Sequence, residues 1–77
     1  MYRAGPLQPT KPPSLTNRER EILALLAQGL SGSEVAVRLE VSRETVKTHI
    51  RNAMRKLDAH SRAHAIVVAV RNGEISL

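Results

Sequence analysis

Cysteine is absent from this sequence of 77 residues, which excludes disulfide bonds and thiolate metal sites. A chain of this length forms one domain, and it buries only about 60% of the surface that its unfolded form exposes. The three histidines, at positions 49, 60 and 64, lack a convincing set of partner ligands. We therefore expect no metal ion and no cofactor, and a fold that is stabilised by the packing of helices.

Aromatic residues are almost missing, since the chain has one Tyr and no Trp or Phe. Proteins that bind single strands or RNA loops usually stack bases on aromatic side chains, so the composition argues against this mode of binding. Twelve Lys and Arg oppose seven Asp and Glu, which gives a formal net charge of +5. This charge suits a polyanionic partner but does not indicate sequence specificity.

Long hydrophobic runs are absent too, because the longest one, Ala65 to Val70, is far shorter than the roughly 20 residues of a membrane-spanning helix. The N-terminus lacks the apolar region of a secretory signal. We therefore expect an intracellular protein without a membrane segment. The sequence also shows no nucleophile–base pair, metal-ligand set or phosphate-cradling glycine loop, so an enzyme is not expected.

All four prolines lie within residues 1–14, where no apolar periodicity is visible. Proline removes a backbone donor and disfavours helix at the preceding residue, so we expect a flexible tail or linker here and a folded domain over residues 15–77. Two interpretations stay open. The tail could follow a further domain of a longer protein, or it could be the loose end of an independent small protein.

Two capping boxes predict the first two helices. Thr16 and Glu19 open a helix that runs to about Gln28 and stops at Gly29. Ser31 with Glu34 then opens a shorter helix that ends near Glu40. The residues expected to face inward are Ile22, Leu23 and Leu26, with Leu25 at the margin, in the first helix, and Val35, Ala36 and Leu39 in the second.

A third helix is expected over 43–57, with Ser42 as its N-cap and apolar Val41 filling the connection before it. So short a connection between two helices is typical of a helix-turn-helix. One side of this third helix is apolar, with Val46, Ile50, Ala53, Met54 and Leu57. The other side carries Lys47, Thr48, Arg51, Asn52 and Arg55.

Cations on an amphipathic helix are usually just solvated surface. The helix-turn-helix changes this interpretation, because its second helix enters the major groove of duplex DNA, where Lys and Arg can donate to guanine. The basic face is therefore a candidate for sequence-specific DNA binding.

Ser61 predicts the N-cap of a last helix, from about Arg62 to Asn72, which Gly73 ends. Ala65, Ile66 and Ala69 are expected to pack on the core. An apolar face that a small core does not cover is a candidate for a twofold interface. The candidate interface residues are His64, Val67, Val68 and Arg71, but Val68 or Val70 could instead complete the core.

The segments LTNREREIL, GLS, EVAVRL, TVKTHI and KL, followed by SRAHAI, occur in order between Leu15 and about Ile75. This series resembles the LuxR-type helix-turn-helix domain, the C-terminal effector domain of NarL/FixJ response regulators. The resemblance implies an all-α four-helix bundle in which the second and third helices form the helix-turn-helix. It also implies a cytoplasmic bacterial transcription regulator, found with the nucleoid, that binds double-stranded DNA as a homodimer through its last helix. RNA polymerase is a further candidate partner.

The resemblance also implies roles for single residues. Lys47, Thr48 and Arg51 match positions that face base edges. The positions nearer to phosphates, or at helix starts that could contact the DNA backbone, are Ser31, Ser42, Thr45, His49 and Arg55. For His49 a partly packed ring is an equal alternative, because it lies beside the apolar stripe.

Two positions depart from the family pattern. Gly32-Ser33 stand where Asn-Lys is frequent, which removes a cation near the start of the second helix, and Glu40 stands where glycine is frequent. The motif further suggests an ion pair between Glu21 and Arg62, with two solvated charges as the alternative. Two rival functions stay open at this point, the promoter-reading fourth region of a sigma factor and a helical protein-interaction module.

Overall fold

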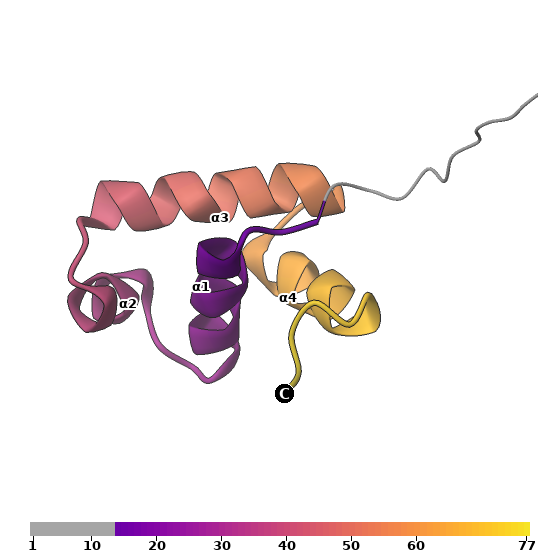
Figure 1. Ribbon diagram of the computed structural model, residues 1–77, viewed down its shortest axis with the longest axis horizontal. Helices are drawn as coiled ribbons and strands as arrows, with labels where there is room; N and C mark the ends of the chain where they lie inside the picture. Colours follow the sequence, from indigo (N-terminus) through magenta and orange to yellow (C-terminus); the bar gives the residue numbers. More distant parts are fainter. Residues whose placement is uncertain (1–13) are drawn as a thin grey trace, which may run out of the picture.

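The computed structural model describes residues 14–77, which form four α-helices and no β-strand (Figure 1). The helices are α1 (Asn17–Ala27), α2 (Gly32–Leu39), α3 (Arg43–Leu57) and α4 (Arg62–Arg71). The predicted all-α fold is confirmed, and each helix lies within a residue or two of its predicted range. Except for Ser14, the predicted tail of residues 1–14 lies outside the described residues.

Each helix begins at a hydroxyl residue that accepts a hydrogen bond from the backbone N–H three positions later, as the sequence predicts. The distances between the two atoms are 3.0–3.1 Å. Both predicted capping boxes form as well. The four N-caps are Thr16, Ser31, Ser42 and Ser61.

All four helices also share the same C-terminal backbone motif. A backbone N–H bonds to the carbonyl five residues earlier, and the residue just before that N–H has a positive φ, as in a Schellman motif. Glycine fills this position at Gly29 and Gly73, which the sequence predicts. Glu40 (φ 60°) and Asp58 (φ 53°) fill it after α2 and α3. The turn before α3 therefore keeps the left-handed conformation that favours glycine, although its residue is a glutamate.

Helix α3 is the longest of the four helices. It runs along one side and packs against the other three helices, with α1 between α2 and α4 (Figure 1). Two buried clusters lie along it. The cluster toward α4 contains Leu15, Leu23, Ala53, Leu57, Ala65 and Ala69, and the cluster toward α2 contains Ile22, Leu25, Val35, Ala36, Val46 and Ile50.

The burial of α1 differs from the prediction at two positions. Leu25 is buried although the sequence places it at the margin, and Leu26 is only partly buried although it is predicted to face inward. The reason is that α1 packs against helices on two sides, so its buried arc is wider than a single stripe. Leu39, Met54 and Ile66 are likewise half-buried, and they pack against the edges of the clusters.

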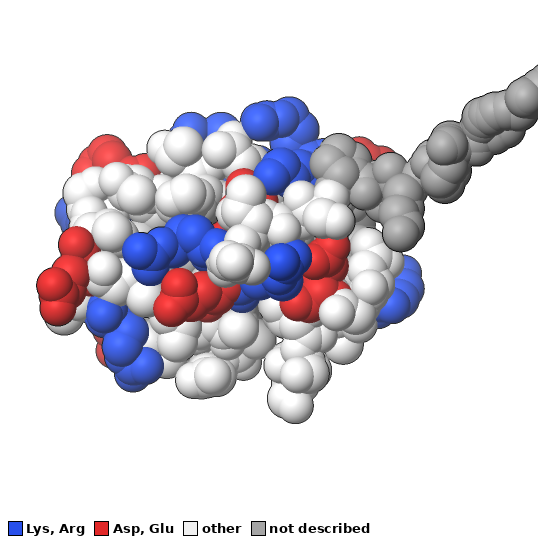
Figure 2. All heavy atoms as spheres, in the orientation of Figure 1, with Lys and Arg blue, Asp and Glu red and all other residues white. Residues whose placement is uncertain are grey.

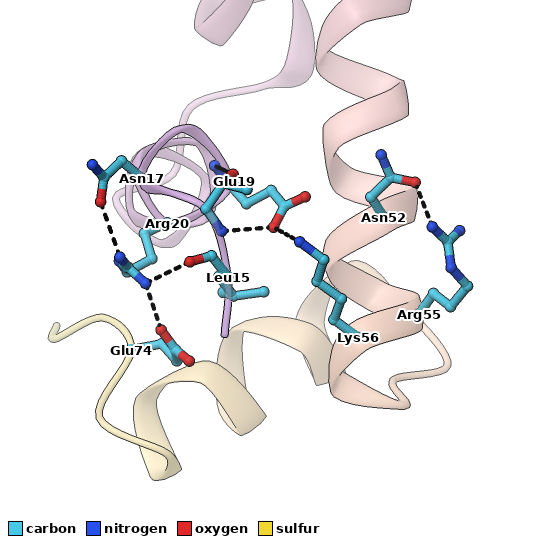
Figure 3. A network of polar contacts seen from close by, with 9 residues as sticks. Leu15, Asn17, Glu19, Arg20, Asn52, Arg55, Lys56 and Glu74 are labelled. Atoms are coloured by element: carbon cyan, nitrogen blue, oxygen red, sulfur yellow. Dashed lines mark hydrogen bonds and ion pairs between the residues drawn. The ribbon is translucent and has the colours of Figure 1, made fainter. Parts of the chain in front are cut away.

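An ion pair that the sequence does not predict ties α1 to α3. Glu19 is 3% exposed, and its Oε1 accepts from Lys56 Nζ at 2.8 Å and from the Thr16 backbone N–H at 2.9 Å (Figure 3). Burial raises the pKa of the Glu19 carboxyl, but the bonds from Lys56 and Thr16 together lower it below its ordinary value. This carboxylate is therefore ionised and bound inside the fold.

A second unpredicted network holds the segment after α4 against α1. Arg20 Nη1 donates to Glu74 Oε1 at 2.9 Å and to the Leu15 carbonyl at 2.7 Å (Figure 3). The suggested pair between Glu21 and Arg62 is wrong, because Glu21 accepts from Arg18 on the next turn of α1, at 3.2 Å. Arg62 extends instead toward the start of α2.

Candidate nucleic-acid interface

The outer face of α3 carries the three side chains predicted to face bases. Lys47, Thr48 and Arg51 are exposed, while Val46 and Ile50 on the same helix are buried. The apolar stripe thus fixes the helix in an orientation that points the three polar side chains into solvent. Within residues 14–77 none of the three hydrogen-bonds to another side chain. Their donors and acceptors are available to a ligand.

The residues predicted near phosphates form two groups. Ser31, Ser42 and Thr45 are exposed at the starts of α2 and α3, whereas Arg55 lies near the far end of α3. The serine hydroxyls already accept the capping bonds, and Ser42 Oγ also donates to Thr45 Oγ1 at 2.9 Å. Their remaining hydrogen-bonding capacity faces solvent.

Arg55 and His49 complete the predicted set. Arg55 Nη2 donates to Asn52 Oδ1 at 2.9 Å, so its guanidinium lies along the outside of α3 (Figure 3). His49 is half-buried. This partial burial is compatible with both interpretations of His49, a partly packed ring and a donor to phosphate.

Two further cations near this face are not among the predicted site residues. Arg43, in the first turn of α3, donates from Nη1 to Ser33 Oγ at 3.2 Å. Arg62 reaches from the start of α4 to Gly32. Conversely, Lys56 belongs to α3 but is bound to buried Glu19 and does not add to the outer basic face. A helical pattern gives the face of each residue but not these contacts across helices.

In the view of Figure 2, Lys and Arg atoms emerge in the middle of the upper edge of the molecule, over α3, with acidic atoms toward the ends of this edge. Basic and acidic side chains alternate on the face below (Figure 2). Glu44 is the single acidic residue of α3, which also contains Arg43, Lys47, Arg51, Arg55 and Lys56. A helix with this charge is attractive to a polyanion.

The predicted interface residues of α4 differ in exposure. Val67 is 49% exposed and Arg71 is exposed, while His64 is half-buried. His64 Nδ1 accepts from the His60 backbone N–H at 3.1 Å, and the two imidazole rings stack. Val68 packs against the cluster toward α4, so the alternative that it completes the core is confirmed.

The part of the chain from Ser14 onward offers no three side chains of the His, Cys, Asp and Glu type that could share a metal ion. Its longest helix, α3, has 15 residues, and none of its four helices could span a membrane.

Comparison with known proteins identifies what this arrangement is similar to. Residues 13–69 match the family model described as bacterial regulatory proteins, luxR family. The chain is 46% identical over 65 residues to the spore germination protein GerE of Bacillus subtilis, an alignment that covers 84% of this chain and 88% of GerE. It is 53% identical over 55 residues to a nitrate/nitrite response regulator protein homolog of Haemophilus influenzae, covering 71% of this chain. That alignment covers only 26% of the longer Haemophilus protein.

Solved structures agree with the family match. The transcription factor GerE superposes with a TM-score of 0.78 at 42% sequence identity, covering 80% of this chain and 92% of the GerE chain. The response regulator ChrA, from a heme-sensing two-component system, gives a TM-score of 0.76 at 39% identity. The superposition with ChrA covers 86% of this chain and 32% of ChrA.

Proposed function

Because this chain belongs to the luxR family of bacterial regulatory proteins and is a DNA-binding domain of a transcription regulator, we propose that it reads duplex DNA sequence-specifically through α3. Family membership also separates it from enzymes and from the two rival functions, the sigma-factor region and the protein-interaction module. In a helix-turn-helix the second helix lies in the major groove, and its N-terminal residues contact base edges. Here that helix is α3.

The observation that carries this proposal is the outer face of α3. Lys47, Thr48 and Arg51 lie in the N-terminal half of the helix, exposed and without side-chain partners within residues 14–77. Lys and Arg can donate to the O6 and N7 atoms of guanine, and a threonine can bond to a base edge or contact a thymine methyl. We assign base contacts to these three residues.

Phosphate contacts would then fix the orientation of α3 on the duplex. We assign them to the remaining candidates along the helix-turn-helix. Arg55 would approach a phosphate from the far end of α3, and weaker hydrogen bonds would come from Ser31, Ser42, Thr45 and the exposed part of His49.

We further infer that the domain binds DNA as a homodimer through α4, on two half-sites about 10 base pairs apart. Val67 is one of the few large apolar side chains that are exposed among residues 14–77, and His64 and Arg71 flank it on α4. Val68 contributes at most an edge to this interface, because it packs on the core.

The proposal also covers the longer protein to which the domain could belong, its compartment and its partners. The chain spans about a quarter of the Haemophilus response regulator and 40% of a response regulatory protein of Escherichia coli, YgeK. In a longer protein, a regulatory domain N-terminal to the given sequence would supply the signal. The alignment with GerE, which covers 88% of that protein, represents the alternative of an independent small protein. The place of the domain would be the bacterial cytoplasm, at the nucleoid, and RNA polymerase is a candidate partner of the complete regulator.

Selection of bound sites from a library of random duplexes tests the function most directly. We expect enrichment of a two-part motif whose halves are centred about 10 base pairs apart. Binding should weaken steeply with salt, with a log–log slope on the order of −0.9 for each neutralised phosphate. Enrichment of no sequence, or affinity that does not depend on salt, would contradict the proposal.

A further inference from the structure

A hollow of about 230 Å³ lies beside the outer face of α3. Ser31, Gly32 and Ser33 line it from the start of α2, Arg43, Val46 and Lys47 from α3, and Arg62 from the start of α4. We call it the basic hollow, because three of its seven lining residues are cations and none is acidic. It is smaller than a typical site for a drug-sized ligand, roughly 300–1,000 Å³.

The cations of the basic hollow are not neutralised from within the domain. Arg43, Lys47 and Arg62 take part in none of the ion pairs that residues 14–77 form. Two carboxylates belong to the first turns of the adjoining helices. Glu34 of α2 is held in its capping box by the N-cap backbone N–H at 2.8 Å, and Glu44 of α3 takes part in none of the ion pairs within residues 14–77. Three like charges around one hollow, without an ion-pair partner in the described part of the chain, favour the binding of an anion.

Backbone donors add to this charge. The first N–H groups of a helix have no acceptor within the helix, and the capping bonds of α2 satisfy Glu34 and Val35 but leave Gly32 and Ser33. The Arg62 guanidinium lies close to Gly32, since a Cβ built at this position would be in ordinary van der Waals contact with it, 3.6 Å from Nη1 and 3.7 Å from Nη2. Arg43 is held over the same turn by its bond to Ser33 Oγ.

We propose that Arg43 and Arg62, together with the free N–H groups of Gly32 and Ser33, bind one phosphate group of the DNA backbone. The first helix of a helix-turn-helix crosses the backbone, and Lys47 lies both on the rim of the hollow and next to Thr48 on the base-reading face. This inference rests on the proposed function. With this contact, α4 becomes a helix that touches DNA. Arg62 then supplies a positive charge near the start of α2, where Gly32-Ser33 lack the lysine that is frequent in the family.

Two variants with matched controls test the proposal. Arg62→Gln removes one cation from the basic hollow, and Arg38→Gln removes one from an exposed position elsewhere on α2. Gly32→Asp adds a carboxylate inside the hollow, and Val37→Asp adds one at a side chain that is 79% exposed. An aspartate in the first turn of a helix is favourable, so Gly32→Asp should fold even if Arg62→Gln does not.

The readout is affinity for a selected duplex and for a random duplex over a series of salt concentrations. We expect Arg62→Gln to weaken binding roughly tenfold on both duplexes and to reduce the salt slope by about 0.9. Gly32→Asp should weaken it at least as much, whereas the two controls should change it less than about threefold. The proposal is overturned if Arg62→Gln and Gly32→Asp behave like their controls while the wild-type chain still binds DNA. Loss of the proposed function shows differently, as failure of the wild-type chain to bind any duplex.

A second measurement separates DNA phosphate from free phosphate. The amide resonances of Gly32 and Ser33 should shift when a short duplex is added, and inorganic phosphate should shift them only at far higher concentration. Shifts with inorganic phosphate at low concentration, and none with the duplex, would assign the basic hollow to a free anion and overturn the proposal.

Discussion

Two non-glycine residues, Glu40 and Asp58, have a strained backbone conformation with positive φ. Glu40 and Asp58 adopt left-handed conformations that cost a residue with a side chain about 1–2 kcal/mol, and glycine fills the equivalent position after α1 and α4. Aspartate tolerates this region better than glutamate does. The strain is therefore greater at Glu40, in the turn that sets α3 relative to α2.

Replacing Glu40 by glycine should stabilise the domain. We expect the free energy of unfolding to rise by about 0.5–1 kcal/mol, since the relief of strain exceeds the extra entropy of glycine in the unfolded chain. Urea unfolding followed by circular dichroism measures the change. Glu40→Gln is the control, because it removes the charge from the end of α2 and keeps the strain. An equal gain in both variants would assign the effect to charge.

The bond between Glu19 and Lys56 should govern stability at acidic pH. The folded-state pKa of Glu19 is lowered, so its contribution is complete above the ordinary glutamate pKa and is lost as pH falls through the lowered value. Lys56→Met leaves a buried carboxylate without its cation, so burial should raise the pKa. We expect a loss of about 2–3 kcal/mol at neutral pH and an acid transition that begins at higher pH.

Urea unfolding across a series of pH values checks both parts of this prediction. The matched control is Arg18→Met, which breaks an ion pair between half-exposed partners and should cost less than about 0.5 kcal/mol. If the two variants had the same acid transition, Lys56 would not control the ionisation of Glu19.

At the scale of elements, α3 should divide its DNA contacts along its length. Arg51→Ala should cost about 1–3 kcal/mol in binding to a selected site and relax preference at one base pair. Arg55→Ala should weaken binding to all sequences about equally and flatten the salt dependence, because phosphates are the same in every sequence. Site selection with each variant distinguishes these outcomes, and uniform weakening by Arg51→Ala would make it a phosphate contact.

Local signals account for most of what the sequence predicts about these elements. Hydroxyl caps, glutamates three residues later and terminal glycines act within one turn of chain, so the four helices and their order follow from them. Contacts between elements that are distant in the sequence do not follow from such local signals. The wide buried arc of α1, the Glu19–Lys56 pair and the approach of Arg62 to Gly32 all depend on how helices pack, and no periodicity in a single helix indicates them.

The candidate site divides in the same way. The exposed polar face of α3 could be predicted, because Lys47, Thr48 and Arg51 need only lie opposite the buried stripe of their own helix. Arg43 and Arg62 could not be predicted, since their contacts lie on another helix. The assignment of Val68 stayed open for the same reason, because only the position of α4 on the core decides it.

At the scale of the whole molecule, α4 should join two copies of the domain on DNA. Val67→Asp puts a charge on the outer side of α4 and should abolish cooperative binding to paired half-sites while changing the free energy of unfolding by less than about 0.5 kcal/mol. Sedimentation with a paired-site duplex measures the stoichiometry. Val68→Asp should instead destabilise the domain, because that side chain packs on the core. Unchanged cooperativity in Val67→Asp would exclude this face as the interface.

The separation between the two sides of α3 has a consequence for how this domain can evolve. Its inner side belongs to both buried clusters, whereas Lys47, Thr48 and Arg51 on its outer side are exposed and belong to neither cluster of residues 14–77. With the base contacts proposed for these three positions, mutations there would change which DNA sequences the domain binds at little cost in stability. A duplicated gene could acquire a new set of target genes by a few such substitutions, each of which leaves a folded protein.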